Sequence, residues 1–320
     1  MPGLRIHVVA AVIENQQGQV FIAKRPSHVH QGNLWEFPGG KVENDESATQ
    51  ALRRELFEEI GIHVQEAEPL IQISHDYPDK SVLLDVYRVK YFNGKAHGKE
   101  GQQTRWISKS EFDQFEFPAA NKAILNAAVL PQYYLITPEP DLNQKNTFLE
   151  NIEHRLKSGI TLIQLRAKRL DPQQLKTLFL EVREINQPYN ASLLINSSVK
   201  FAENIGAQGV HLSSTELMNT ISRPKDLLCS ASCHSESEII TAAQLNLDFV
   251  VISPVLKTTT HPGSASLGWE KFGNLCRNSP IPVFALGGME LEHLPRAIQS
   301  GAQGIAGIRS LWCKTLQNSV

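Results

Sequence analysis

The stretch from Gly40 to Ile62, GKVENDESATQALRRELFEEIGI, constrains the fold of this chain more than any other part of its sequence. Ser47 followed by Gln50 is a capping box, which predicts the start of a helix, and Gly61 predicts its end. We therefore expect a helix over residues 48–60 with a loop on either side. An apolar face for packing is predicted from the spacing of Ala48, Leu52 and Leu56.

Three glutamates gather on another face of this predicted helix. Glu55, Glu58 and Glu59 are spaced i, i+3 and i+4, so their carboxylates lie within one turn. Such a cluster can be an ordinary solvated surface, on which Arg53 and Arg54 offset the negative charge. Like charges at this spacing are mildly destabilising unless something compensates them, and Mg²⁺ prefers carboxylate oxygens together with substrate phosphates. The pattern therefore favours a metal site.

The complete set of spacings resembles the Nudix box, the signature of the Nudix hydrolases. The matching residues are Gly40, Glu46, Arg54, Glu55, Leu56, Glu58, Glu59, Gly61 and Ile62. The resemblance implies cleavage of a diphosphate linkage by water, with Mg²⁺, or Mn²⁺ in its place, as the cofactor. It implies that the three glutamates are catalytic metal ligands, together with a backbone carbonyl at Gly39 or Gly40. It also implies that Glu46 and Arg54 hold the loop.

Length and composition allow two soluble domains. The chain has 320 residues, of which 41% are hydrophobic and 20% are charged. A formal net charge of -2, with both signs mixed, gives no basic field for a nucleic-acid backbone, so a nucleotide monomer is a better candidate partner than a polymer.

The cysteines and the N-terminus bear on where the protein works. No CxxC spacing occurs among Cys229, Cys233, Cys276 and Cys313, which argues against disulfides and a zinc ribbon and favours reduced thiols in a cytoplasm. The apolar run at residues 7–13 is too short to span a membrane and lacks the form of a signal peptide. We therefore expect a cytoplasmic protein without a membrane partner.

Short strand-like segments flank the Nudix-like stretch. A β-hairpin is predicted from residues 7–13 and 20–23, with a polar turn between them. A Pro-Gly-Gly turn is predicted at the end of residues 33–40, where Gly39 and Gly40 let the backbone approach a ligand or metal. Further strands are expected at 70–75, 81–92 and 103–107, and a helix at 119–129. These elements predict an α/β/α sandwich with a mixed sheet over residues 1–130.

Two further segments resemble the MutT type of Nudix hydrolase. The segment HGKEG supplies Glu100, and FEFPAAN ends with Asn121 at a predicted helix start. In that subfamily an acidic residue at the Glu100 position assists the metal site, and the asparagine reads the purine edge of an oxidised guanine nucleotide. A carboxamide offers a donor and an acceptor, which match a base edge with O6 and a protonated N7. Without the resemblance, a helix cap is the simpler role for Asn121.

The MutT resemblance implies a substrate and further contacts. The implied reaction converts 8-oxo-dGTP, or the related 8-oxo-GTP, to the monophosphate and pyrophosphate, which removes a mutagenic nucleotide from the pool. Arg25 matches a contact to phosphate or sugar, and Phe37 matches a wall of the base pocket. Without the resemblance, a core position is the simpler explanation of Phe37. Glu55, with Glu100 as its rival, would take the proton of the attacking water.

The sequence pattern changes after Leu130 and Pro131. From there, short apolar strands alternate with helical segments. The expected strands are 133–136, 161–165, 192–195, 209–212, 227–231, 249–252, 283–286 and 304–306. This repetition predicts a (β/α)8 TIM barrel over residues 131–320, with its chemistry at the carboxyl ends of the strands.

Residues at those strand ends resemble thiamine phosphate synthase and its TenI-type relatives. The matching positions are Gln164, Arg166, Lys168, Asn196, His234, Thr258, Thr260, Gly268, Gly287 and Gly288. The resemblance implies a thiazole or pyrimidine phosphate ligand, with Arg166 and Lys168 suited to a diphosphate and the Gly287-Gly288 turn suited to a phosphate. A tight turn between strand and helix would also explain the two glycines.

Three positions depart from the synthase pattern. Ser197 stands where the synthase has an aspartate, Glu216 lies near its second metal-binding aspartate, and His261 lies where a lysine is expected. These changes weaken the case for ionising a pyrimidine diphosphate. His234 instead matches the acid/base histidine of TenI-type thiazole tautomerases.

Two alternative functions therefore stay open. In one, the Nudix site hydrolyses diphosphates of the thiamine pathway and the barrel is a synthase or tautomerase. In the other, the barrel is a non-catalytic sensor of a phosphate ligand.

Overall fold

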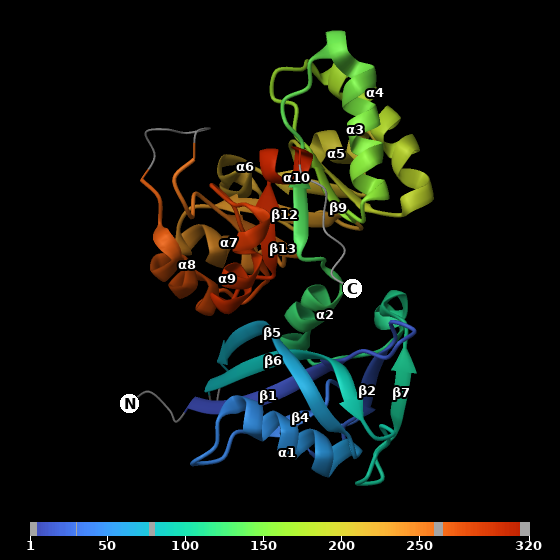
Figure 1. Cartoon of the computed structure of the whole chain (residues 1–320), viewed down its shortest axis with the longest axis vertical. Coiled ribbons are helices and arrows are strands. Elements are labelled where there is room, and N and C mark those ends of the chain that lie inside the picture. The colour runs from blue at the N-terminus through green and yellow to red at the C-terminus, as the bar shows by residue number, and fades with distance from the viewer. Residues whose placement is uncertain (1–4, 30, 77–80, 259–264, 314–320) are drawn as a thin grey trace. The chain divides into compact units, whose positions relative to one another are not determined.

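The computed structural model describes residues 5–29, 31–76, 81–258 and 265–313. The chain divides into two compact units, Met1–Val129 and Leu130–Val320 (Figure 1). Our sequence boundary lies one residue further on, after residue 130. Among the described residues, none of the helices combines the length and the apolar character needed to span a bilayer.

The N-terminal unit contains two sheets. One has the order β4-β1-β6-β5, in which β1 runs parallel to β6 and the other neighbours are antiparallel; the second has the order β3-β2-β7 and is antiparallel. The strands are β1 (Arg5–Ile13), β2 (Val20–Lys24), β3 (Trp35–Glu36), β4 (Gly39–Lys41), β5 (His63–Asp76), β6 (Ser81–Asn93) and β7 (Thr104–Ile107). A mixed sheet is thus confirmed.

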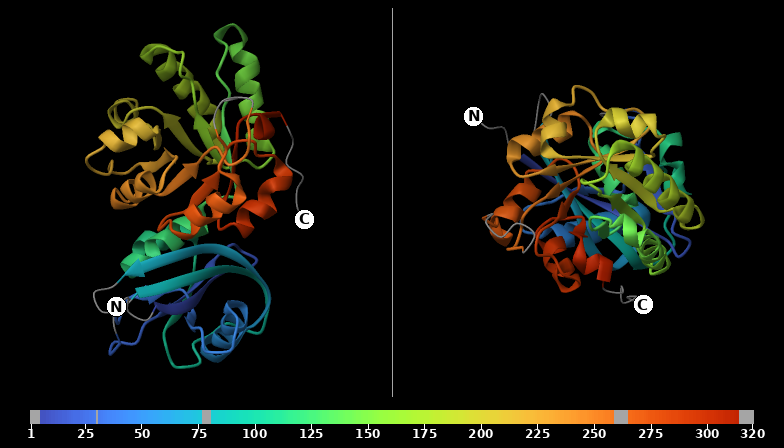
Figure 2. Two further views of the ribbon diagram at one scale, coloured as in Figure 1. Left: turned by 90° about the vertical axis from the view of Figure 1, so that its left-hand side faces the viewer. Right: turned by 90° about the horizontal axis from the view of Figure 1, so that it is seen from above.

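Helices cover both faces of this mixed sheet. Helix α1 (Ala48–Ile60) and helix α2 (Lys122–Val129) lie on opposite sides (Figure 2, left). The alternation of side chains along β1 explains the two cores, because Val9 and Ala11 pack toward α1 while Ala10 and Val12 pack toward α2. Two short 3-10 helices, η1 (Lys109–Gln114) and η2 (Ala119–Asn121), precede α2. The α/β/α sandwich is confirmed.

Two local predictions near the N-terminus are wrong in detail. The turn between β1 and β2 forms, with an isolated bridge between Glu14 and Val20, but the two strands then diverge into different sheets instead of making a hairpin. The Gly39-Gly40 pair is also extended: both residues belong to β4 and pair with β1. Strand β1 pairs with β4 and β6, and β2 pairs with β3 and β7. Turn signals in the sequence do not contain this information about distant partners.

Helix α1 begins and ends where the sequence predicts. The Ser47 hydroxyl accepts a hydrogen bond from the Gln50 N–H at 3.3 Å, and the Gln50 side chain accepts one from the Ser47 N–H at 2.8 Å. Gly61 ends the helix with a φ of 76°, a left-handed conformation that glycine adopts without steric cost. The apolar face is buried through Ala51, Leu52, Leu56 and Ile60.

The C-terminal unit is a closed barrel of eight parallel strands in the order β10-β11-β12-β13-β14-β15-β8-β9. The strands are β8 (Tyr133–Ile136), β9 (Leu162–Leu165), β10 (Ser192–Asn196), β11 (Gly209–Leu212), β12 (Leu228–Cys233), β13 (Phe249–Ile252), β14 (Val283–Ala285) and β15 (Gly304–Gly307). All eight predicted strands are present within a residue or two of their expected ends, and the TIM barrel is confirmed.

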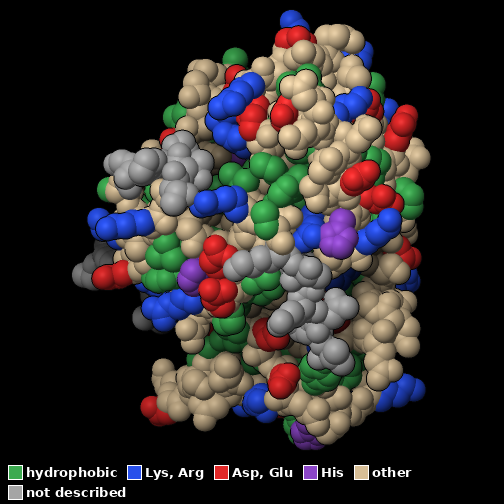
Figure 3. Space-filling model, turned by 45° about the horizontal axis from the view of Figure 1, so that its top comes forward, with side chains coloured by type: hydrophobic (Ala, Val, Ile, Leu, Met, Phe, Trp, Pro, Cys, Tyr) green, Lys and Arg blue, Asp and Glu red, His purple; other side chains and the backbone are tan. Residues whose placement is uncertain are grey.

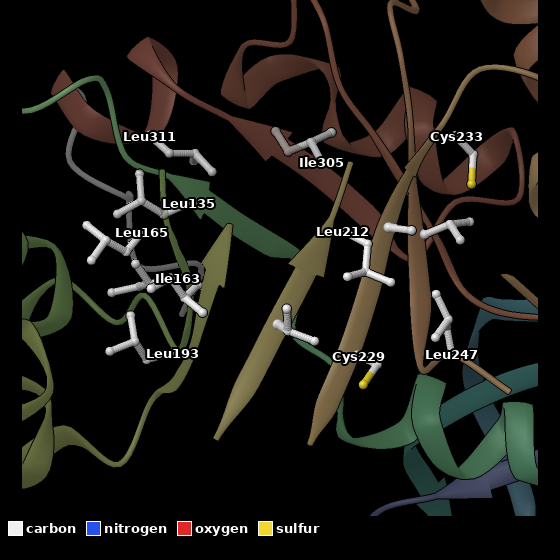
Figure 4. Close-up of a cluster of buried hydrophobic side chains, with 14 of the residues drawn as sticks. Leu135, Ile163, Leu165, Leu193, Leu212, Cys229, Cys233, Leu247, Ile305 and Leu311 are labelled. Carbon is white, nitrogen blue, oxygen red and sulfur yellow. The ribbon is translucent and has the colours of Figure 1, made fainter. Parts of the chain in front are cut away.

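Helices surround this ring of strands (Figure 1; Figure 2, right). They are α3 (Lys145–Lys157), α4 (Pro172–Asn186), α5 (Val199–Asn204), α6 (Ser214–Asn219), α7 (Glu236–Gln244), α8 (Gly268–Arg277), α9 (Leu294–Gln299) and α10 (Arg309–Cys313), with short 3-10 turns η3 (Leu142–Gln144), η4 (Gln187–Tyr189) and η5 (Leu291–His293). Leu135, Ile163, Leu165 and Leu193 are among the side chains that fill the layer between strands and helices (Figure 4).

The inside of the barrel is packed at one level and polar at another. Tyr134, Phe249 and Phe284 meet in the middle, with ring centroids 5.2 to 5.6 Å apart. Leu162 in β9 and Leu194 in β10 also belong to this inner cluster. Because side chains alternate along a strand, the residues two positions later face inward as well, at the carboxyl ends of these strands. Those residues include Gln164 and Asn196, so the barrel places polar groups where such folds carry their chemistry.

Candidate functional site

Arg54 organises the first half of the Nudix-like site. Its guanidinium contacts Glu46 at 2.6 Å, Glu55 at 2.9 Å and Glu58 at 3.2 Å, and it donates to the Lys41 carbonyl at 3.1 Å. The hydrogen bond from Arg54 lowers the pKa of Glu46, and the Glu43 N–H adds to the effect. Arg54 therefore ties the loop before α1 to the carboxylate face of the helix, in line with the holding role that the resemblance implies for Glu46 and Arg54.

Glycines in β4 let two of the glutamates approach the sheet. A Cβ atom on Gly40 would lie only 2.2 Å from the carboxyl carbon of Glu55, so the absence of a side chain makes room for that carboxylate. A Cβ on Gly39 would lie 2.1 Å from the Val9 carbonyl oxygen, and the Gly39 N–H donates to Glu59 at 3.0 Å. Substitution of either glycine would displace a carboxylate or the strand itself.

Glu59 is the most perturbed carboxylate of this group. Burial raises its pKa to about 7; the hydrogen bonds from the Gly39 N–H and from Gln102 oppose the rise, while the nearby charges of Glu36 and Glu100 add to it. A strongly shifted acid among other acids is typical of functional sites. Glu59 thus stands among carboxylates that repel it.

Glu36 is a member of this cluster that sequence reasoning missed. It lies in β3, forms an ion pair with Arg25, and has a pKa that burial raises. Arg25, which we expected at a phosphate or sugar, therefore contacts a carboxylate in this structure. The available signal was a glutamate between two aromatic residues, Trp35 and Phe37, just before the glycine pair.

The chemistry of these residues fits a divalent cation. The charges of Glu36 and Glu100 lie near enough to Glu59 to raise its pKa, and a hard cation offsets such repulsion. Arg54 forms ion pairs with Glu55 and Glu58. The described part of the chain contains no ready-made group of three metal-binding side chains. Ligation by the Gly39 or Gly40 carbonyl stays a prediction.

Asn121 lies on the α2 side of the same unit. It belongs to η2 and is 9% exposed, and its backbone N–H donates to the Pro118 carbonyl at 2.9 Å. Within the described residues its carboxamide makes no hydrogen bond, and it does not cap α2 in the way that the simpler reading required. Phe37 is buried and stacks on Phe117, with the ring centroids 5.6 Å apart.

In the barrel, the predicted anion-binding residues are already engaged with a carboxylate. Glu139 accepts hydrogen bonds from the backbone N–H groups of Lys168 at 3.1 Å and Arg169 at 2.7 Å, and lies 3.5 Å from the Arg166 guanidinium. Two successive N–H groups and a guanidinium are what an anion would use. Glu139, which our sequence reasoning did not single out, fills that role from within the chain.

The other barrel candidates are spread over several strand ends. Gln164 is 3% exposed, and its Oε1 atom is buried without a hydrogen-bond donor among the described residues. Asn196 donates to the His211 carbonyl at 3.1 Å, and His234 follows β12 with its Nδ1 atom 2.7 Å from the Ser253 carbonyl oxygen. Gly268, with a φ of 73°, begins α8.

The two glycines after β14 serve a close contact between loops. A Cβ on Gly287 would lie 2.8 Å from Pro254, and one on Gly288 would lie 2.7 Å from the Lys257 carbonyl oxygen. The tight-turn explanation therefore accounts for both, and a phosphate contact there stays a prediction. Thr258 lies in the same described loop, whereas Thr260 and His261 fall outside the described residues.

His211 is a further polar residue of the barrel interior that sequence reasoning passed over. Its Nδ1 and Nε2 atoms lie 2.8 Å from the Ser230 hydroxyl and 2.9 Å from the Ser232 hydroxyl, respectively. Burial lowers the pKa of His211 to about 3, and the charge of Lys168 adds to the effect. The ring is therefore neutral, and it fixes two serines below the barrel mouth.

Both signs of charge occur on the surface. On the face that Figure 3 shows, lysine and arginine side chains and aspartate and glutamate side chains are both present. The formal net charge is -2.

Each unit matches a known family. Residues 133–311 match the family described as "Thiamine monophosphate synthase", and residues 9–127 match the family described as "NUDIX domain". The two matches do not overlap, and each lies within one of the two units.

Individual relatives follow the same division. An "8-oxo-dGTP diphosphatase" of Escherichia coli (strain K12) is 34% identical over 121 residues, which are 38% of this chain and 94% of that protein. An "8-oxo-dGTP diphosphatase" of Proteus vulgaris is 43% identical over 97 residues, which are 30% of this chain and 87% of that protein. A "Thiamine-phosphate synthase" of Clostridium acetobutylicum is 27% identical over 181 residues, which are 56% of this chain and 85% of that protein. The chain therefore belongs to the Nudix family through its N-terminal unit and to the thiamine monophosphate synthase family through its barrel.

Proposed function

We propose that the N-terminal unit hydrolyses oxidised guanine nucleoside triphosphates, 8-oxo-dGTP in particular, to the monophosphate and pyrophosphate in a Mg²⁺-dependent reaction. The observation that carries the choice of base is Asn121, which is 9% exposed and whose carboxamide makes no hydrogen bond within the described part of the chain. Its oxygen and its NH₂ group are therefore available to a ligand.

A carboxamide suits the edge of an oxidised guanine. Its oxygen accepts from the protonated N7, and its NH₂ group donates to O6. Unmodified guanine presents only acceptors on that edge, so the same side chain in the same orientation cannot satisfy both of its groups. Asn121 is therefore proposed to discriminate oxidised from ordinary guanine.

The carboxylates are proposed to hold Mg²⁺ and the attacking water. When bound, the cation lowers the pKa of water and offsets phosphate charge. Glu59, fixed by the Gly39 N–H, and Glu58 and Glu100 supply carboxylate oxygens. Glu55, which lies against Gly40, is our candidate to accept the proton of the attacking water, and Glu100 is the alternative.

The test is product release by the full chain from 8-oxo-dGTP, dGTP and thiamine diphosphate, with Mg²⁺ and with EDTA. We expect Asn121→Ala to lower kcat/KM for 8-oxo-dGTP about 10-fold to 100-fold and to change that for dGTP far less, the loss expected for one or two ligand hydrogen bonds. Asn121→Asp, which keeps the shape but cannot donate, serves as the matched variant. An equal loss on both nucleotides, or thiamine diphosphate as the better substrate, would contradict the proposal.

For the barrel, we propose a proton-transfer reaction on a thiazole phosphate. The observation that favours it is the His234 ring: a carbonyl oxygen 2.7 Å from Nδ1 can only accept, so Nδ1 carries the hydrogen and Nε2 is left as a base. The ring is exposed, and its backbone N–H is held by Glu238. A fixed tautomer with a free basic nitrogen is suited to removing a proton from carbon.

This second proposal is tested by proton exchange. A thiazole phosphate is incubated with the full chain in D₂O, and loss of its carbon-bound proton signals is followed by ¹H NMR. We expect exchange that His234→Gln abolishes while phosphate binding persists. Binding without exchange by the unaltered protein would support a non-catalytic sensor instead.

A further inference from the structure

We propose that Gln102 positions Glu100 against Glu59 and so sets the affinity of the Nudix site for a divalent cation. This inference rests on the proposed function of that site. Gln102 is a positioning residue here, since it acts through the two carboxylates and not on the substrate.

Gln102 contacts both of the segments that carry these carboxylates. Its Nε2 atom donates to the Glu59 carbonyl at 3.1 Å, and its Oε1 atom accepts from the Glu100 N–H at 2.9 Å. One neutral side chain thus bridges the end of α1 and the loop before β7.

The loop around Gln102 is shaped to keep this bridge. A Cβ atom on Gly98 would lie 2.2 Å from the Gln102 carbonyl oxygen and 2.8 Å from its Oε1 atom, so the side chain lies directly against that glycine. The loop backbone also docks on the helix end, because the N–H groups of His97 and Lys99 donate to the carbonyls of Ile60 and Glu59 at 3.1 and 3.0 Å. These bonds satisfy carbonyls that the end of a helix leaves without partners.

The bridge matters because the two carboxylates repel each other. Glu100 is exposed on a loop, and the charges of Glu100 and Glu59 disfavour a close approach. Without the Gln102 bridge, the loop would have to become ordered when the Glu59 and Glu100 carboxylates bind the same cation. The entropy lost in that ordering would weaken the affinity for the cation. Residues that hold metal ligands in place typically change metal affinity about 10-fold to 100-fold when removed.

Lys99 provides a matched control in the same loop. Its Nζ atom donates to the Phe57 carbonyl at 3.0 Å and lies 4.4 Å from the centre of the Phe57 ring. It therefore fastens the loop to the same end of α1, but within the described residues its side chain contacts Phe57 and neither carboxylate. Loss of general loop docking and loss of carboxylate positioning can thus be separated.

The experiment is a Mn²⁺ titration of the full, metal-free chain, followed by the EPR signal of free Mn²⁺ at a pH of about 8. Gln102→Met keeps a side chain of similar length against Gly98 and removes both hydrogen bonds, and Gln102→Ala is the second variant. Far-UV circular dichroism and the unfolding midpoint are recorded for each. We expect both variants to bind Mn²⁺ about 10-fold to 100-fold more weakly, and Lys99→Met to stay within about twofold of the unaltered protein.

Two results would overturn the inference: an affinity of Gln102→Met within about twofold of the unaltered protein, or an equal loss in Lys99→Met. Unaltered protein that binds Mn²⁺ without hydrolysing 8-oxo-dGTP contradicts the proposed substrate alone, and the ratio of variant to unaltered affinity still decides for or against Gln102. Failure of the unaltered protein to bind Mn²⁺ overturns both.

Discussion

The two units build polar sites in opposite ways. In the Nudix unit, carboxylates on α1, β3 and the Glu100 loop lie close together, and among the described residues Arg54 and Arg25 form ion pairs with some of them. In the barrel, the cationic strand end is already satisfied by Glu139, and the interior is filled by neutral groups such as His211 and its two serines. The excess negative charge of the Nudix site favours binding of a cation from solution. In the barrel, an anionic ligand has to compete with the Glu139 side chain for the same donors.

The same contrast sets the direction of each titration. Burial raises the pKa of Glu59 from 4.5 to about 7 and lowers that of His211 from 6.5 to about 3. Both shifts favour the neutral form, because both groups lose water. Since one group is an acid and the other a base, acid has opposite effects on the two units.

Removal of a Nudix carboxylate should produce the largest and most localised effect. We expect Glu58→Gln to lower Mg²⁺-dependent turnover of 8-oxo-dGTP by at least about 100-fold, because a group that stabilises developing charge is lost. Steady-state pyrophosphate release measures this. Glu66→Gln, at an exposed glutamate of β5, is the control and should change little. Full Mg²⁺-dependent turnover by Glu58→Gln would contradict the assignment of Glu58 to the catalytic metal site.

Opposite responses to acid should appear when the metal-free protein is unfolded at about pH 7 and about pH 5. Glu59, whose pKa is raised, stabilises the Nudix unit below 4.5, and this contribution is lost as the pH rises through about 7. His211, whose pKa is lowered, stabilises the barrel above 6.5, and this contribution is lost as the pH falls toward about 3. Between the two conditions we expect each unit to change by about 2 kcal/mol, with opposite signs.

Tryptophan fluorescence assigns these transitions, since Trp35 and Trp106 lie in one unit and Trp269 and Trp312 in the other. Glu59→Gln should flatten the pH dependence of the first and His211→Gln that of the second. A shift of both units in the same direction would show that other groups dominate.

Glu139→Gln tests whether the barrel's anion site is blocked from within. Loss of the charge beside Arg166 should raise the affinity of the full chain for inorganic pyrophosphate about tenfold, which corresponds to about 1.4 kcal/mol. Isothermal titration in EDTA, in a Glu58→Gln background, keeps the Nudix site out of the measurement. Addition of Arg166→Ala to Glu139→Gln should abolish the increase in pyrophosphate affinity. An unchanged affinity in Glu139→Gln would show that Glu139 has a purely structural role.

Helix caps should have the smallest effect and the same effect in both units. Ser47 begins α1 and Asp171 begins α4, each through a capping box. Replacing either by Ala should lower the unfolding free energy of its own unit by about 1 kcal/mol. Denaturant unfolding monitored through the two tryptophan pairs measures this, and a cost that spreads to the other unit would show that the two do not unfold separately.

Part of the Nudix site could be read from the chain because it depends on short-range spacing. The caps of α1 and the shared face of Glu55, Glu58 and Glu59 follow from helix periodicity alone. Glu36 could not be placed in that way, since its nearness to Glu59 depends on how β3 and β4 lie beside α1. The hairpin prediction for β1 and β2 was wrong for the same reason, because the partner of a strand depends on all the other strands that can pair with it.

The sequence by itself determined which elements form and in what order: the capped helix α1, the eight barrel strands, and the residue types at their ends. These follow from hydrogen bonds and side-chain periodicity within a few residues of each other. Only the tertiary structure decided which charges meet: Glu139 with Arg166, Glu36 with Arg25, and Gln102 between Glu59 and Glu100. The physical reason is that several partners compete for each charged or polar group, and the competition is settled by distances that exist only once the chain has folded.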